Sequence, residues 1–346
     1  MSKSDPMKLV LSVVDPDYPN DSSVKELVND NGLFKSATKL AEKNGLYYYF
    51  IYRLKELGVE IPSSEDDRWN EEIEKLSYLK ETITLLNEAS KECGLNYVLI
   101  KACTKIPHVP RDVDIFIRDK DQRAFVGALE GKGMKCIHSD DVDTTLTKGD
   151  YMKVDIYTGL CYFTTEFIDE GFLWKSQHAD KMFDIDYPGL NEEANFLVML
   201  VHSLFGHSSM SLLDFLHMKS LIGGIRDMDV CRNYAYEMGW GSAFDLTMDR
   251  MESINISTYK EGENIDFPYM FDQKFILKCI SDIDGLDMTN LNKIFLRISL
   301  IQDRAIFELK DTPLYNLLKS IEPIRKFINT VGYYIRDRRG DKRSEG

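Results

Sequence analysis

Cysteine is scarce in this sequence, and its cysteines are not clustered. The six cysteines are spread through 346 residues without a CxxC pair. Zinc knuckles and disulfide frameworks need closely spaced cysteines, so neither kind of protein is indicated. We therefore expect reduced thiols, most of them buried.

The sequence also lacks a long hydrophobic run near its start. The apolar stretch there, Leu9 to Val14, is interrupted by Ser12. It is too short for the hydrophobic region of a secretory signal and far too short to span a membrane. We therefore predict a cytoplasmic protein that does not engage the membrane.

Positive charge is scarce relative to negative charge. The chain has 43 Lys and Arg against 57 Asp and Glu, which gives a formal net charge of −14. Because nucleic-acid phosphates are bound mainly by Lys and Arg, this balance argues against a broad nucleic-acid-binding surface. Hydrophobic residues make up 43% of the chain, and at this length that is enough for the cores of two domains.

Acidic residues are present in an informative pattern within YVLIKACTKIPHVPRDVDIFI, from Tyr97 to Ile117. This stretch predicts a hydrophobic strand, a short loop and a second strand that carries Asp112 and Asp114. Because side chains alternate across a strand, both acids face one way while Val113 and Ile115 face a core. Neighbouring carboxylates favour a cation, and Mg²⁺ often needs only one or two protein carboxylates plus substrate phosphates.

A third acid follows the same rule in YMKVDIYT, residues 151 to 158. Alternate positions are apolar there, which leaves Lys153 and Asp155 on the opposite face. A helix predicted over Lys120 to Lys132, followed by two β-like runs, would bring this strand back beside the first. We expect Asp155 to complete a metal-binding triad in a small mixed sheet.

This order of elements resembles the nucleotidyltransferase fold that is shared with the palm of DNA polymerase β. The residues that carry the resemblance are the strand before the loop, the hDxDhhh strand of Asp112 and Asp114, and the later hhDh strand of Asp155. The helical stretch from Phe34 to Leu54 and the segment LNEEANFLVMLVHSLFGHSSMSLLDFLHMKSLI from Leu190 are similar to the helical flanks of uncharacterised nucleotidyltransferase-like families. The resemblance implies an α+β fold with a small mixed sheet and helical flanks.

The resemblance also implies an activity, which is metal-dependent transfer of a nucleoside monophosphate from a nucleoside triphosphate to an acceptor hydroxyl. Mg²⁺ would be held by Asp112, Asp114 and Asp155. The residues assigned to nucleotide binding are Lys101, Thr104, Lys105, Arg111 and Lys153. The acceptor stays open between a small molecule, an RNA end and a protein hydroxyl.

Three other functions stay open at this point. Residues 101 to 105 read KACTK where the family usually has a Gly-Ser or Lys-Gly pair, which fits a catalytically inactive fold used as a binding or scaffold protein. Three short predicted helices between Ser23 and Gly58 fit a DNA-binding regulator, with Arg53 and Lys55 on the third, although its aromatic residues favour packing. A DxD also holds the metal of sugar-nucleotide glycosyltransferases, but that fold needs several strand–helix units before its motif.

The rest of the pattern divides the chain into five parts. We expect a loose or edge-strand segment over 1–22, a helical region over 23–95, the nucleotidyltransferase-like core over 96–165, a helical domain over 166–335 and a charged tail over 336–346. A long amphipathic helix from Trp69 to Cys93 would pack on the sheet. The acidic run from Ser139 to Asp143 predicts a hairpin turn. His202 and His207 are five apart, a spacing that does not favour a zinc site on one helical face.

Overall fold

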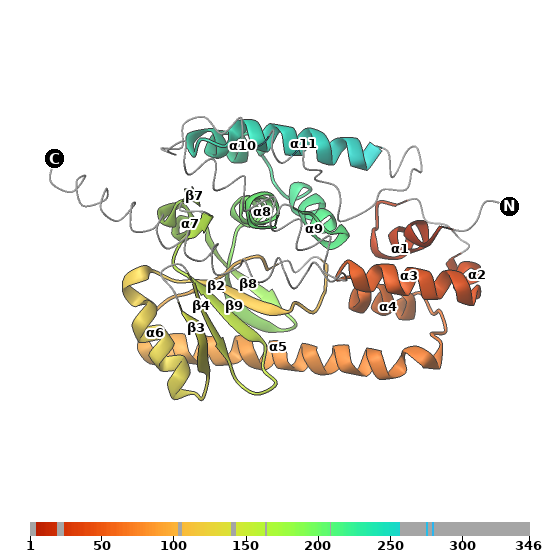
Figure 1. Cartoon of the computed structure of the whole chain (residues 1–346), viewed down its shortest axis with the longest axis horizontal. Coiled ribbons are helices and arrows are strands. Elements are labelled where there is room, and N and C mark those ends of the chain that lie inside the picture. The colour runs from red at the N-terminus through yellow and green to blue at the C-terminus, as the bar shows by residue number, and fades with distance from the viewer. Residues whose placement is uncertain are drawn as a thin grey trace, which may run out of the picture.

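The structure, a computed structural model, describes residues 5–18, 24–102, 106–139, 143–162, 165–207 and 209–256, together with Phe275 and Cys279. These residues form an α+β fold around a five-stranded mixed sheet, as the sequence predicts (Figure 1). Several predictions lie outside the described residues. They are the nucleotide-binding assignments of Thr104 and Lys105, the hairpin tip at 140–142, the helices expected after residue 256 and the charged tail.

The central sheet has the strand order β1-β2-β5-β4-β3. The strands are β1 (Val98–Leu99), β2 (Asp112–Phe116), β3 (Lys135–Ser139), β4 (Asp143–Thr147) and β5 (Lys153–Tyr157). β2 and β5 run parallel, and the other neighbouring pairs are antiparallel. Parallel neighbours need a long connection, which here contains α6 (Asp119–Gly131) and the β3–β4 pair. This connection brings the third acid back beside the first two.

Two helices, α5 (Asp66–Cys93) and α6, cover one face of this sheet (Figure 1). α5 ends at Gly94, whose φ of 68° suits glycine and whose N–H donates to the Ser90 carbonyl. Apolar side chains of α5, among them Leu79 and Leu86, share one buried cluster with apolar residues of β2 and β5. The prediction of a long helix packed on the sheet is confirmed, although the helix begins at Asp66 rather than at Trp69.

The N-terminal segment contains a buried helix, so the prediction of a loose or edge-strand segment is wrong where the structure describes it. α1 spans Pro6–Val14, and the Asp5 side chain caps its start by accepting from the Met7 N–H. Proline is favourable in a first turn because its missing N–H is not needed there. The turn-forming residues that suggested an irregular segment, Asp15 and Pro16, begin only where α1 ends.

The three short helices predicted after Ser23 are present as α2 (Val24–Val28), α3 (Asn31–Lys43) and α4 (Tyr47–Glu56). The basic residues of α4 contact their own chain. Arg53 forms an ion pair with Glu56 at 2.5 Å, and Lys55 Nζ lies 4.0 Å from the ring centre of Trp69. These contacts and the buried aromatic side chains of α4 favour packing over a DNA-reading role.

Two hairpins lie between residues 160 and 190, where the sequence suggested mostly helix. β6 (Leu160–Tyr162) pairs with β7 (Thr165–Ile168), and β8 (Gln177–Met182) pairs with β9 (Ile185–Leu190), with the short helix α7 (Glu170–Lys175) between the hairpins. Phe183 and Asp184 connect β8 to β9 with φ of 49° and 70°, as in a type I′ turn. The sequence pattern over 163–176 predicts a helix, but Thr165–Ile168 form a strand and the helix begins only at Glu170. Pro188 and Gly189 together predict a turn, but both residues pair within β9.

Five helical elements follow and lie across the sheet from α5 (Figure 1). They are α8 (Glu192–Val201), the π-helical segment His202–His207, α9 (Leu212–Ile222), α10 (Met228–Glu237) and α11 (Gly241–Ile256). Their buried side chains join those of α1, α3 and α4 in a second hydrophobic cluster. Among the described residues, none of the helices combines the length and the apolar character needed to cross a membrane.

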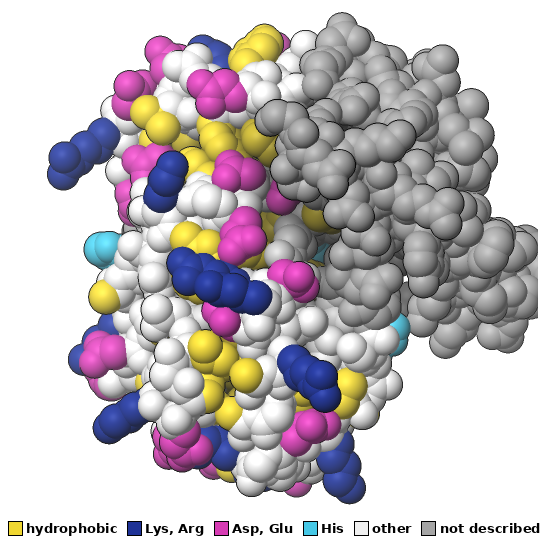
Figure 2. All heavy atoms as spheres, turned by 90° about the vertical axis from the view of Figure 1, so that its left-hand side faces the viewer, with side chains coloured by type: hydrophobic (Ala, Val, Ile, Leu, Met, Phe, Trp, Pro, Cys, Tyr) yellow, Lys and Arg dark blue, Asp and Glu magenta, His cyan; other side chains and the backbone are white. Residues whose placement is uncertain are grey.

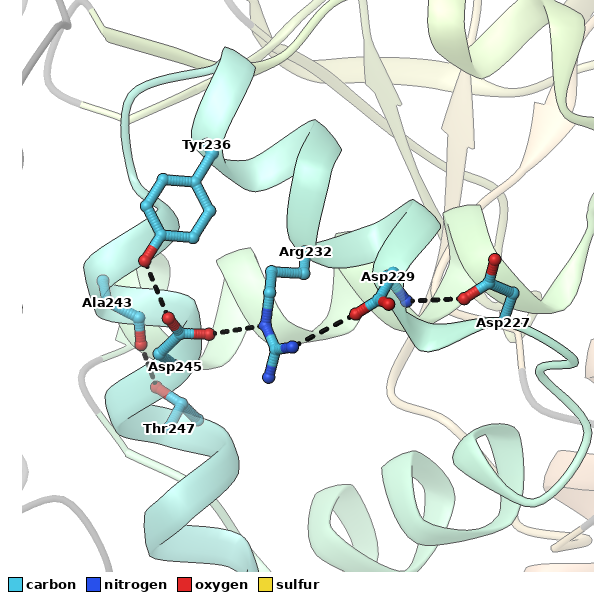
Figure 3. A network of polar contacts seen from close by, with 7 residues as sticks. All are labelled: Asp227, Asp229, Arg232, Tyr236, Ala243, Asp245 and Thr247. Atoms are coloured by element: carbon cyan, nitrogen blue, oxygen red, sulfur yellow. Dashed lines mark hydrogen bonds and ion pairs between the residues drawn. The ribbon is translucent and has the colours of Figure 1, made fainter.

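A polar network joins α10 to α11 (Figure 3). Arg232 of α10 contacts Asp245 of α11 at 2.9 Å and Asp229 at 3.1 Å. The Tyr236 hydroxyl donates to the second oxygen of Asp245 at 2.7 Å. A Cβ on Gly241 would lie 2.3 Å from the Tyr236 ring, so only glycine allows this approach. The network links the two helices at largely exposed positions, where ion pairs contribute little to stability.

Charges of both signs are mixed on the face that Figure 2 presents. Lys and Arg side chains lie next to Asp and Glu side chains, with apolar side chains between them. On this face, the described residues form no continuous basic field of the kind that binds nucleic-acid backbones.

Candidate functional site

Three acidic side chains meet on the face of the sheet that α5 does not cover. In the parallel register of β2 and β5, Asp114 lies opposite Asp155, and Asp112 lies opposite Lys153. Oxygens of Asp112, Asp114 and Asp155 all lie within 4.8 Å of one another. In the part of the chain that the structure describes, this is the group of ligand side chains that could hold a metal ion. The side-chain alternation of the two strands predicts this grouping.

Burial and repulsion raise the pKa of two of these acids. Burial raises the pKa of Asp114 to about 6, against the attraction of the Lys101 ammonium. Burial also raises the pKa of Asp112, and the negative charge of Asp155 adds to this effect. A divalent cation would replace this repulsion with attraction. An all-oxygen set of ligands fits a hard cation such as Mg²⁺.

Two further side chains contact the acids from the neighbouring strands. Lys101, which follows β1, places its Nζ 2.7 Å from Asp114 Oδ1. Thr145 of β4 lies opposite Asp155, and its hydroxyl donates to Asp155 Oδ1 at 2.6 Å. Sequence reasoning missed Thr145, because the partner of Asp155 depends on the β4–β5 register, which the sequence does not give.

The basic residues predicted to bind nucleotide lie near the acids wherever they are described. The positive charges of Lys101, Arg111 and Lys153 all act on Asp112 and oppose the rise of its pKa. Arg111 and Lys153 are exposed, so their charged groups are free to meet a ligand at the rim of the site. Lys101 is more enclosed, with 15% of its side chain exposed.

A pocket of about 370 Å³ lies over the triad. The sheet side of the pocket carries Lys101 and the three acids, and α8, the π-helical segment and α9 supply the opposite wall. Residues of that wall include Met199, His202, Ser203, Asp214 and His217. The pocket is lined by both apolar and polar side chains, a combination that is found in small-molecule sites. The sequence predicted the acids but not the composition of this wall.

A pair of histidines lies in the wall of the pocket. The ring centres of His108 and His217 are 4.8 Å apart, and each ring has a nitrogen 3.3 Å from the Ile106 carbonyl oxygen. Because a carbonyl only accepts, His108 donates from Nδ1 and His217 from Nε2. Burial lowers the pKa of both rings, and that of His217 falls well below the usual value. The neutral pair holds the loop before β2 against α9.

Comparisons with known proteins give few matches. No protein-family model matches this chain, and no curated protein matches it. Among solved structures, the chain is similar to the lincosamide antibiotic adenylyltransferase LnuA with lincomycin bound. That match has 20% identity over 41% of this chain and 95% of that chain, with a TM-score of 0.32. A second match is the antibiotic-resistance factor ANT(2'')-Ia, with 12% identity over 51% of this chain and 97% of that chain, and a TM-score of 0.33. At these scores neither likeness assigns a family, so a function has to be argued from the site.

Proposed function

We propose that the protein is a nucleotidyltransferase that moves a nucleoside monophosphate from a nucleoside triphosphate to an acceptor hydroxyl. The observation that carries this proposal is the convergence of Asp112, Asp114 and Asp155 at one side of a pocket that also holds a lysine. Carboxylates at this spacing suit Mg²⁺, and neighbouring cations suit phosphates. The acceptor is a small molecule, an RNA end or a protein hydroxyl.

Mg²⁺, when bound, would offset the negative charge of the triphosphate and favour loss of the proton from the acceptor hydroxyl. The three carboxylates of the chain would hold it, and Arg111 and Lys153 at the rim would contact phosphate oxygens. In the transfer, the acceptor oxygen bonds to the α-phosphorus and its proton passes to solvent. The bond from the α-phosphorus to the oxygen bridging to the β-phosphorus breaks, and pyrophosphate leaves.

Residues that position the substrates are sufficient for this chemistry. Charge accumulates on the phosphate oxygens in the transition state, so catalysis depends mainly on alignment and neutralisation. Thr145 restrains Asp155 through its hydrogen bond, and the neutral His108–His217 pair restrains the loop that leads into β2. We also assign phosphate contacts to Thr104 and Lys105, which lie outside the described residues.

Calorimetric titration with the four nucleoside triphosphates tests the proposal. We expect the parent protein to bind at least one of them in Mg²⁺ and not in EDTA, and Asp112→Asn/Asp114→Asn to lose this binding. The matched control is Asp119→Asn/Asp121→Asn, which removes two acids of the same spacing from the first turn of α6. Binding by this control would show that the loss is specific to the triad.

The same titration separates transfer from the scaffold alternative. If the parent protein binds no triphosphate in Mg²⁺, the proposed donor is wrong, and an inactive fold that binds other partners becomes the better reading. If binding persists in Asp112→Asn/Asp114→Asn, the nucleotide lies elsewhere. Metal-dependent binding in the parent alone leads to a screen of acceptors, with pyrophosphate release as the measurement.

A further inference from the structure

Lys101 is held by two contacts on the acidic face of the sheet. Its Nζ lies 2.7 Å from Asp114 Oδ1 and 5.1 Å from the ring centre of Tyr157 in β5. The side chains of Lys101 and Asp114 are only 15% and 11% exposed. Solvent and salt screen a pair at this depth weakly, and the aromatic face attracts the ammonium as well. The ammonium is therefore a fixed part of the site.

The backbone at Lys101 adopts a conformation that is uncommon for a residue with a side chain. Its φ of 57° lies in the left-handed region, which residues other than glycine rarely adopt. The preceding residue, Ile100, donates its N–H to the Asp114 carbonyl at 3.0 Å, so the strained turn is anchored directly beside the acid. Strain of this kind is concentrated at functional sites. Glycine would fit this backbone but would bring no charge to Asp114.

The contacts of the triad leave a defined set of oxygens for a metal ion. In the described structure, Lys101 contacts Oδ1 of Asp114 and the Thr145 hydroxyl contacts Oδ1 of Asp155. The second oxygens of these two acids and both oxygens of Asp112 are left. One Mg²⁺ needs only one or two protein carboxylates. Two ions at the usual separation of about 3.5–4 Å need carboxylates that can bridge them.

We propose that the Lys101 ammonium takes the place of a second metal ion, so that the acidic triad binds a single divalent cation. This inference rests on the proposed function and adds the number of metal ions to it. In the enclosed part of the site, one divalent ion and the Lys101 ammonium together carry the charge that offsets three ionised carboxylates, whereas Arg111 and Lys153 are exposed to solvent. A second divalent ion would lie next to the ammonium, where like charges in a poorly screened site repel strongly.

Counting bound Mn²⁺ tests the inference without relying on activity. Mn²⁺ favours the same oxygen ligands as Mg²⁺. Equilibrium dialysis against Mn²⁺ alone would give the number of ions per chain, after subtraction of the number bound by the same protein with Asp112→Asn/Asp114→Asn. We expect one ion for the parent and two for Lys101→Met, which keeps an unbranched side chain, one atom shorter, and removes the charge. The pair in Lys101→Met should give a spin-coupled electron paramagnetic resonance spectrum.

Two control variants separate the charge of Lys101 from other effects. Lys101→Arg keeps the charge and should bind one ion. Lys153→Met makes the same charge change on the same face of the sheet and should also bind one. Circular dichroism would establish that each variant is folded.

Two outcomes would overturn the inference alone. Two ions in the parent protein would show that Lys101 does not replace a metal ion, and one ion in folded Lys101→Met would show that Lys101 is not what excludes the second. Both outcomes leave the nucleotidyltransferase proposal standing. A parent protein that binds no Mn²⁺ at the triad would overturn the inference and the proposed metal site together.

Discussion

The two faces of β2 and β5 are made of alternate residues of the same strands, yet they differ in what they contribute. Val113 and Ile115 are 3% and 0% exposed and pack in the cluster formed with α5 and α6. Asp112 and Asp114 alternate with them and face the pocket. Burial of apolar surface stabilises the sheet, whereas burial of neighbouring carboxylates costs free energy. The free energy gained on the apolar face thus offsets the cost of the cluster of carboxylates on the acidic face.

The largest effect on stability is expected from the apolar face. Ile115→Ala would leave a cavity between β2 and the helices and lower the free energy of unfolding by about 2–5 kcal/mol. Urea denaturation measures this loss. Ile137→Ala is the matched control, because Ile137 in β3 is 55% exposed and its truncation should change stability by less than about 0.5 kcal/mol. Equal losses in the two variants would contradict the contrast between the faces.

Removing the charge of Asp114 from the acidic face should raise the free energy of unfolding, and only at higher pH. The pKa of Asp114 is raised from 3.8 to about 6, so the native state binds this proton more tightly than the unfolded chain. The protonated Asp114 side chain therefore stabilises the native state fully below about pH 4, and this stabilisation is lost as the pH rises through about 6. The size of this loss is on the order of 2–3 kcal/mol.

Asp114→Asn tests this pH dependence, because asparagine keeps the shape of the acid without its charge. In EDTA, the variant should match the parent near pH 4 and be more stable than it at pH 7. Thermal denaturation across this range measures the difference. A variant that is less stable than the parent at pH 7 would mean that the ion pair with Lys101 outweighs the burial of the charge.

The smallest effect is expected at the edge of the acidic face. Thr145→Val removes the hydroxyl that restrains Asp155 and keeps the shape of the side chain. We expect Mg²⁺-dependent nucleotide affinity to fall by about 3- to 10-fold, in line with the loss of one hydrogen bond. Thr147→Val, two residues further along the same strand, is the control. An equal loss in both variants would mean that Thr145 has no particular role at the acid.

The acidic triad could be predicted because alternation in a strand is a local property. Asp112 and Asp114 are two residues apart, and the same alternation assigns Asp155 to one face of its own strand. The further step, that the two strands are adjacent, came from the helix and the two β-like runs predicted between them, and the resemblance agrees with it. The structure places Asp114 and Asp155 in register.

Other elements could not be predicted, for reasons that differ from case to case. Asp5 and Pro6 are residues typical of a helix start, but the turn-forming residues after α1 suggested an irregular segment instead. The β8–β9 hairpin was missed because Pro188 reads as a turn, although it pairs with Ala179. The His108–His217 pair joins a loop to α9, and contacts between distant segments leave no pattern in a single sequence.

The parallel register of β2 and β5 also affects how the chain tolerates changes in length. The triad depends on how side chains alternate along β2 and β5, which have five residues each. None of its three acids comes from the long connection between these strands. Residues added to or removed from the loops of that connection, outside β4, would leave the acids in place. A single residue inserted within β5 before Asp155 would turn this acid toward α5 and α6. The loops of the connection can therefore vary in length, whereas β2, β5 and the part of β4 that carries Thr145 are restricted to substitution.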